Sequence, residues 1–172
     1  MCQARYLAAM LEAISFRLAT AADAPVIASH RAKMFRDMGD LPPDQFQNMV
    51  AAARRDLTAL LAAGTYVGWL AAPTADPATV IAGAGIQLRP MLPRPGKSIR
   101  EGPEAIVVNV YTEPDWRRRG VARCLMERII EWSRLHQVAK LVLHASTDGR
   151  PLYEQLGFAA TNEMHYSGEL SL

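Results

Sequence analysis

The chain has 172 residues, of which half are hydrophobic and 21% are charged, values that fit one globular domain. A net charge of +2 argues against a nucleic-acid-binding protein, and no stretch is long and apolar enough to span a membrane. The two cysteines, Cys2 and Cys124, are too few for a disulfide framework or a zinc site, so we expect a reduced, cytoplasmic protein without a metal.

The first third of the chain predicts a strand and two helices. Residues 6–16 are largely apolar without the layout of a signal peptide, and they predict an N-terminal helix. Residues 14–18 alternate apolar and polar side chains, which is typical of a strand. Thr20 is placed to cap a helix that ends near Met38, and a second helix is expected over residues 44–63.

The rest of the chain predicts strands and two further helices. A loop rich in proline, glycine and basic residues is expected at residues 89–103. Val121, Leu125, Ile129 and Trp132 recur on one face, which indicates a helix. The remaining expected elements are strands at residues 65–71, 80–88, 104–112, 140–145 and 164–170, and a short helix at residues 148–156.

The junction between the strand at 104–112 and the following helix carries Arg117-Arg118-Arg119-Gly120-Val121-Ala122. Backbone N–H groups exposed at the start of a helix bind phosphate groups. Gly120 lets the backbone approach an anion without a Cβ in the way, and the arginines, with Arg123, add positive charge. A run of arginines is also typical of a solvated surface or a weak nucleic-acid patch, but the strand–turn–helix context favours a phosphate site.

A second motif, Leu152-Tyr153-Glu154-Gln155-Leu156-Gly157-Phe158, follows the strand expected at 140–145. In this order the two motifs resemble the GCN5-related N-acetyltransferase (GNAT) superfamily, closely over roughly the C-terminal third and by layout over the N-terminal half. The resemblance implies the acyl-CoA N-acyltransferase fold, of class α/β (α+β), with a mixed, mostly antiparallel central sheet flanked by helices. It also implies a single N-acetyltransferase domain over residues 1–172, with residues 1–13 as an extra N-terminal segment.

The resemblance implies an enzyme that transfers an acetyl group from acetyl-CoA to a primary amine of a small molecule or a protein. In the family, the arginine loop wraps the pyrophosphate of the coenzyme. The end of the strand at 104–112 would pair with the pantetheine arm, and a backbone N–H there would polarise the thioester carbonyl. The implied coenzyme-binding residues are Val110, Tyr111, Thr112, Arg117, Arg118, Arg119, Gly120, Val121, Ala122, Arg123, Ser146 and Tyr153.

The resemblance also implies roles for Ser146 and Tyr153 and leaves the general base open. Ser146 stands where many relatives carry an asparagine that contacts the pantetheine, and a serine hydroxyl can still form a hydrogen bond there. Tyr153 is implied as the general acid that protonates the leaving thiolate. The general base stays open: Glu113 is taken first, and the alternatives are Glu104, His144 and a water oriented by Asn109.

Selection of the acceptor is expected to involve the two N-terminal helices and the loop at 89–103. Alternative functions are a regulatory module that binds acyl-CoA without catalysis, and an acyltransferase that uses another acyl-CoA. Related proteins are often dimers, so a homodimer is an alternative to a monomer.

Overall fold

The computed structural model describes residues 13–95, 99, 101–164 and 166. Five strands form one sheet in the order β1-β2-β3-β4-β5, in which the first four strands are antiparallel and β5 is parallel to β4. Their bounds are β1 Ile14–Leu18, β2 Tyr66–Pro73, β3 Ala82–Arg89, β4 Glu104–Thr112 and β5 Lys140–Leu143.

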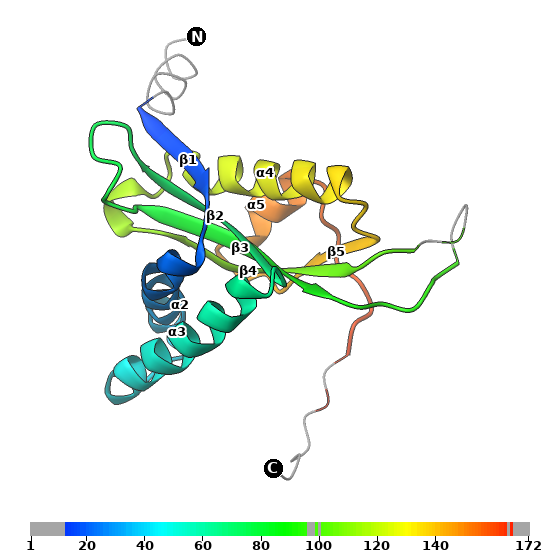
Figure 1. The fold of residues 1–172 in the computed structure, drawn as a ribbon, viewed down its shortest axis with the longest axis horizontal. Helices are drawn as coiled ribbons and strands as arrows, with labels where there is room; N and C mark the ends of the chain where they lie inside the picture. The colour runs from blue at the N-terminus through cyan, green and yellow to red at the C-terminus, as the bar shows by residue number, and fades with distance from the viewer. Residues whose placement is uncertain (1–12, 96–98, 100, 165, 167–172) are drawn as a thin grey trace.

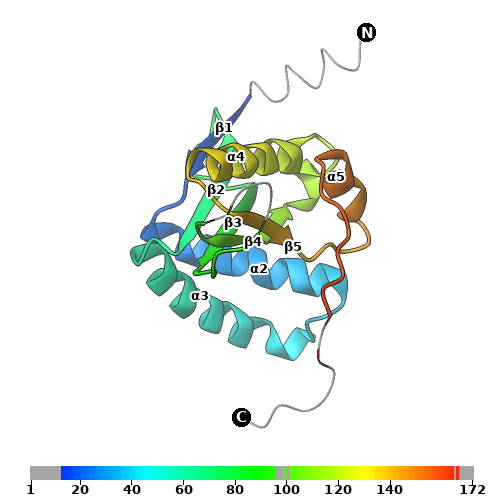
Figure 2. The same ribbon diagram turned by 90° about the vertical axis from the view of Figure 1, so that its right-hand side faces the viewer.

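Helices cover both faces of this sheet (Figure 1, Figure 2). Helices α2 (Ala24–Met38) and α3 (Phe46–Ala62) lie on one face, and helices α4 (Val121–Leu135) and α5 (Arg150–Gln155) lie on the other. The mixed, mostly antiparallel sheet flanked by helices confirms the predicted fold class.

Each face of the sheet has its own apolar core. Under α4, the fully buried side chains of Leu125 and Ile129 pack against the sheet, as expected from their helical spacing. On the other face, Ile27 of α2 and Leu57 of α3 pack with Leu70 of β2. The two cores fix the sheet between its helices, so the strand ends that carry the predicted site are held on a rigid scaffold.

Strands β4 and β5 pair over only part of their length. The parallel ladder runs from Glu104 with Lys140 to Val107 with Leu143, and β4 continues for five residues beyond it. In that continuation Asn109 has a φ of 58°, and the register against β3 shifts between Gly83 and Gly85, which marks a β-bulge. The bulge and the divergence leave a β4 edge without a β5 partner.

The predicted elements differ from the observed ones mainly at their ends. The helix expected after Thr20 begins with a 3₁₀ turn, in which the Thr20 N–H donates to the Asp23 carboxylate at 2.8 Å. The strand expected at 140–145 ends at Leu143, where the chain leaves the ladder. Most of the helix expected at 6–16 and of the strand expected at 164–170 lies outside the described residues.

Candidate functional site

Two adjoining cavities open where β4 and β5 diverge. One has a volume of about 700 Å³ and extends to α2, and the other has a volume of about 590 Å³ and extends to the start of α4. The residues that line both cavities are Val110, Tyr111, Thr112, Arg117, Ser146, Asp148 and Tyr153. The shared lining makes them two parts of one cleft, with the β4 edge and Tyr153 at the junction.

The smaller cavity contains most of the predicted coenzyme-binding set. Gly120 has a φ of 80° and stands at the N-cap of α4, whose first N–H groups lack partners within the helix. Arg118 also has a positive φ, 62°, so the turn before α4 is tightly folded. The predicted residues that line this cavity are Val110, Tyr111, Thr112, Arg117, Arg118, Gly120, Val121, Ala122, Arg123, Ser146 and Tyr153.

Arg119 and Arg117 use their side chains in ways that the arginine run did not predict. Arg119 does not line either cavity, and its guanidinium lies 5.0 Å from the ring centroid of Trp116. Arg117 donates from Nε to the Thr112 carbonyl at 2.9 Å and forms an ion pair with Asp37 of α2. Arg117 therefore links the end of β4 to α2, while Arg118, Arg123 and the backbone N–H groups at the start of α4 are the other donors of the loop at this cavity.

Tyr153 lies on α5 and lines both cavities. Burial raises the pKa of its phenol above the ordinary value, so the hydroxyl is protonated at neutral pH. Its ring meets that of Phe158 edge-on, with centroids 6.1 Å apart. A protonated hydroxyl at the junction of the cavities can donate a proton to a leaving group bound there.

Ser146 shapes the turn that presents this tyrosine. Its Oγ accepts a hydrogen bond from the Gly149 N–H at 3.1 Å, just before α5 begins. A Cβ at Gly149 would lie 3.0 Å from Cε2 of Tyr153 and 3.1 Å from Oγ of Ser146, so a larger residue there would push these two side chains by a few tenths of an ångström. The serine hydroxyl still has its own proton to donate into the cleft.

The two glutamates considered as bases are engaged by other side chains, and Glu113 also accepts a hydrogen bond from the Tyr111 hydroxyl at 3.4 Å. The Glu113 carboxylate accepts a hydrogen bond from Lys33 Nζ at 2.5 Å and lies 3.5 Å from His30 Nε2. Glu104 pairs with Arg89 and Lys140 at the opposite end of β4. Neither glutamate lines either cavity, whereas Asn109 and His144 both line the larger one.

His30 lies beneath this cleft, between α2 and the sheet. It is 2% exposed, and its ring centroid is 5.1 Å from that of Tyr111. Burial lowers the pKa of His30 to about 4, while the Glu113 carboxylate opposes this shift and Lys33 adds to it. His30 is therefore neutral at physiological pH and acts as a packing residue of α2.

The far wall of the larger cavity is formed by α2. An N–H of Arg31 donates to Asn109 Oδ1 at 2.7 Å, and Asn109 Nδ2 donates to the Tyr66 hydroxyl at 3.2 Å. This buried network holds the β4 bulge, and sequence reasoning missed it because Arg31 and Asn109 are 78 positions apart. The α2 wall, with the turn after it, consists of Arg31, Met34, Phe35, Asp37, Met38 and Asp40.

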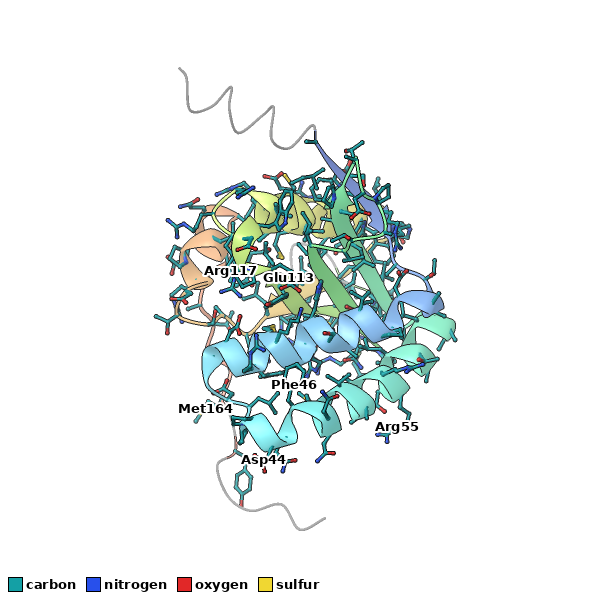
Figure 3. The ribbon with its side chains drawn as sticks, turned by 90° about the vertical axis from the view of Figure 1, so that its left-hand side faces the viewer. Asp44, Phe46, Arg55, Glu113, Arg117 and Met164 are labelled. Carbon is teal, nitrogen blue, oxygen red and sulfur yellow. The ribbon has the colours of Figure 1, made fainter. Side chains whose placement is uncertain are left out.

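Figure 3 views the molecule from the α2 side, with Arg117 and Glu113 between α2 and the sheet.

Within the described residues, no three histidine, cysteine, aspartate or glutamate side chains are grouped to hold a metal ion. In the same part of the chain, the helices are too short or too polar to cross a bilayer.

Comparison with known proteins places this chain in a family. A family model for the acetyltransferase (GNAT) domain matches residues 64–160. Glucosamine 6-phosphate N-acetyltransferase of Trypanosoma brucei brucei is 27% identical over 81 residues, which are 47% of this chain and 52% of that protein. The chain thus spans about half the length of this curated relative.

Two solved structures are similar over most of their length. A GCN5-related N-acetyltransferase from Ralstonia eutropha JMP134 is 29% identical with a TM-score of 0.79, over 89% of this chain and 97% of that one. A predicted acetyltransferase from Clostridium acetobutylicum, solved with acetyl-CoA, is 27% identical with a TM-score of 0.75, over 90% and 96% of the two chains. The chain belongs to the GCN5-related N-acetyltransferase family.

Proposed function

We propose that the protein transfers the acetyl group of acetyl-CoA to a primary amine of a small molecule. The observation that carries this proposal is the meeting of two cavities at Tyr153 and the open β4 edge. In the reaction, the amine nitrogen forms a bond to the thioester carbonyl carbon, and the bond from that carbon to sulfur breaks. The amine loses a proton, and the thiolate of the coenzyme gains one.

The smaller cavity would hold the coenzyme. Backbone N–H groups around Gly120 face a cavity at the start of a 15-residue helix, and this arrangement suits a pyrophosphate. Residues beyond Val107 have no β5 partner, so the amides of the pantetheine can pair with this β4 edge as an added strand. A structure of the similar Clostridium acetobutylicum protein is described with acetyl-CoA, which supports the same coenzyme here.

Tyr153 would donate a proton to the leaving thiolate, and His144 would accept the proton that the amine loses. Tyr153 is the proposed general acid because its protonated hydroxyl lies at the junction of the cavities. His144 is the proposed general base because its imidazole lines the acceptor side, and imidazole is a frequent base in enzymes. Glu113, the first base considered, is replaced in this proposal because its carboxylate contacts Lys33 and lines neither cavity.

The acceptor is proposed from the cavity and from the curated relative. A cavity of about 700 Å³ suits a small molecule, as ligand pockets of this size usually do. The relative from Trypanosoma brucei brucei is named for glucosamine 6-phosphate, so this amino sugar is the first acceptor to test.

The test is release of free coenzyme A thiol with a panel of amines that includes glucosamine 6-phosphate. We expect Tyr153→Phe to lower kcat by about 10² to 10⁴-fold and to leave the Kd for acetyl-CoA unchanged. Full kcat in that variant would remove the acid role. Tight binding of acetyl-CoA without thiol release for any amine would instead favour a regulatory acyl-CoA-binding module.

A further inference from the structure

Arg31 is a partly buried cation on the acceptor side of the cleft that has no carboxylate partner among the described residues. One N–H donates to Asn109 Oδ1, and the guanidinium lies 4.9 Å from the ring centroid of Phe35. Burial lowers the pKa of Arg31, which means that its charge is poorly solvated. Within the described ranges, the arginines that do pair with carboxylates are Arg17, Arg36, Arg55, Arg89, Arg117 and Arg150.

A guanidinium has five N–H donors in a planar fork. In the part of the chain that the structure describes, only one hydrogen bond involves these donors in Arg31, and the side chain lines the cavity of about 700 Å³. A buried charge without a counter-ion is costly, and an anionic ligand that enters the cavity would offset that cost. Carboxylates and phosphates match the geometry of the fork better than other common groups do.

We infer that Arg31 binds an anionic group, a carboxylate or a phosphate, on the acceptor amine. This inference rests on the proposed function, because it assigns the larger cavity to the acceptor. It makes Arg31 a residue that determines specificity, and it narrows the acceptor from any primary amine to an amine that carries a negative charge.

The position of Arg31 also places the proposed anion site in the same cavity as the open β4 edge. Its partner Asn109 directly precedes Val110, which lines both cavities, and consecutive Cα atoms are about 3.8 Å apart. The same cavity is lined by the exposed side chains of Asp40 and Asp148, which suit the ammonium group of an arriving amine.

A purely structural role for Arg31 makes a different prediction. Asn109 has a φ of 58°, and Arg31 could serve only to hold it there. In that case, loss of the guanidinium would affect charged and neutral acceptors equally. The two roles are separated by the ratio of kcat/KM for an anionic amine to kcat/KM for its neutral counterpart, because differences in amine reactivity cancel when variants are compared.

The experiment compares phosphoethanolamine with ethanolamine, and glycine with glycinamide, in wild type, Arg31→Gln and Arg31→Lys. The control variant is Arg55→Gln, which removes the same charge from the α3 surface, on the helix farther from the sheet (Figure 3). We expect Arg31→Gln to lower the ratio for at least one pair about tenfold or more, and Arg31→Lys to recover part of it. A lower ratio for phosphoethanolamine over ethanolamine indicates a phosphate, and a lower ratio for glycine over glycinamide indicates a carboxylate.

Calorimetry measures the Kd of the same probes for the protein loaded with coenzyme A, and this value does not depend on turnover. Unchanged ratios in Arg31→Gln, or no binding of either anionic probe, would overturn the inference. If ethanolamine is still acetylated with thiol release, the proposed function survives that failure. If no amine releases thiol and acetyl-CoA does not bind, it is the proposed function that fails.

Discussion

The two sides of the cleft are built in different ways. On the coenzyme side, two of the contacts are local: Gly149 donates to Ser146 three positions before it, and Arg117 donates to Thr112 five positions before it. A third contact on this side, from Arg123 to Gln155, joins the start of α4 to α5 over 32 positions. On the α2 side, Arg31 and Asp37 reach partners that are 78 and 80 positions away. The coenzyme wall therefore depends mainly on backbone geometry within two short segments, and the α2 wall depends on side chains that meet only in the folded protein.

This difference matches the two tasks of a transferase. Backbone N–H groups at a helix start can bind the pyrophosphate of a coenzyme with little dependence on side chains. The acceptor differs between relatives, and a wall of side chains on α2 can change without disturbing the loop before α4. The comparison predicts which substitutions affect coenzyme binding and which affect the acceptor.

The largest effect is expected from Gly120→Val, which alters the backbone wall itself. Gly120 has a φ of 80°, which strains a β-branched residue, and the added side chain would obstruct the approach of the pyrophosphate. Loss of two or more hydrogen bonds to a charged group corresponds to about 4 kcal/mol, or about a thousandfold in affinity. We expect this loss in the Kd for acetyl-CoA, measured by calorimetry.

Gly64→Val is the matched control for backbone strain. Gly64 also has a positive φ, 68°, and a Cβ added there would have no atom within 4 Å, while the residue lines neither cavity. We expect a lower stability for this variant and an unchanged Kd. Equal Kd values for wild type and Gly120→Val would contradict the backbone account of the coenzyme wall.

A smaller effect is expected from acid, through His30 of α2. His30 has a pKa of about 4 in the folded protein and about 6.5 when unfolded, so only the unfolded chain gains a proton between these values. Stability from this residue is complete above pH 6.5 and falls as the pH drops to 4, by about 3 kcal/mol in total. Urea unfolding at pH 7, 5.5 and 4 measures this slope.

His30→Gln removes the titrating group and should flatten the stability curve in that window. The Asp23 carboxylate, with its pKa lowered to about 2 mainly by the hydrogen bond from Arg17, loses its contribution mainly below about pH 4. The pKa of Glu104 is held below its usual value mainly by the hydrogen bond from Lys140, and its contribution begins to fall at the acid end of the window in both proteins, so the difference between the two curves isolates His30. Parallel curves for wild type and His30→Gln between pH 6.5 and 4 would show that another group controls the acid response.

The residues on the coenzyme side of the cleft could be proposed from the sequence, and those of the α2 wall could not. Gly120 and Tyr153 stand in short motifs whose backbone context is encoded by adjacent residues, so their common cavity followed from two segments of sequence. Glu113 illustrates what the sequence alone could not predict. Its position after β4 suggested a general base, but its carboxylate contacts Lys33, which lies 80 positions away in the sequence. The roles of Arg31 and Asp37 also needed the packing of α2 on β4.

The Asp37–Arg117 ion pair joins the two walls, and its effect should be the smallest. Arg117 is partly exposed, so the pair should contribute about 0.5 to 1 kcal/mol. In a double-mutant cycle with Asp37→Asn and Arg117→Gln, we expect a coupling energy of that size in the KM for the acceptor at saturating acetyl-CoA. The exposed pair Arg55 and Asp56 on α3 provides the control cycle, with no expected coupling in the same KM. Additive effects of Asp37→Asn and Arg117→Gln would mean that the loop and α2 act independently, whereas coupling would show that the coenzyme loop helps to position the wall that selects the acceptor.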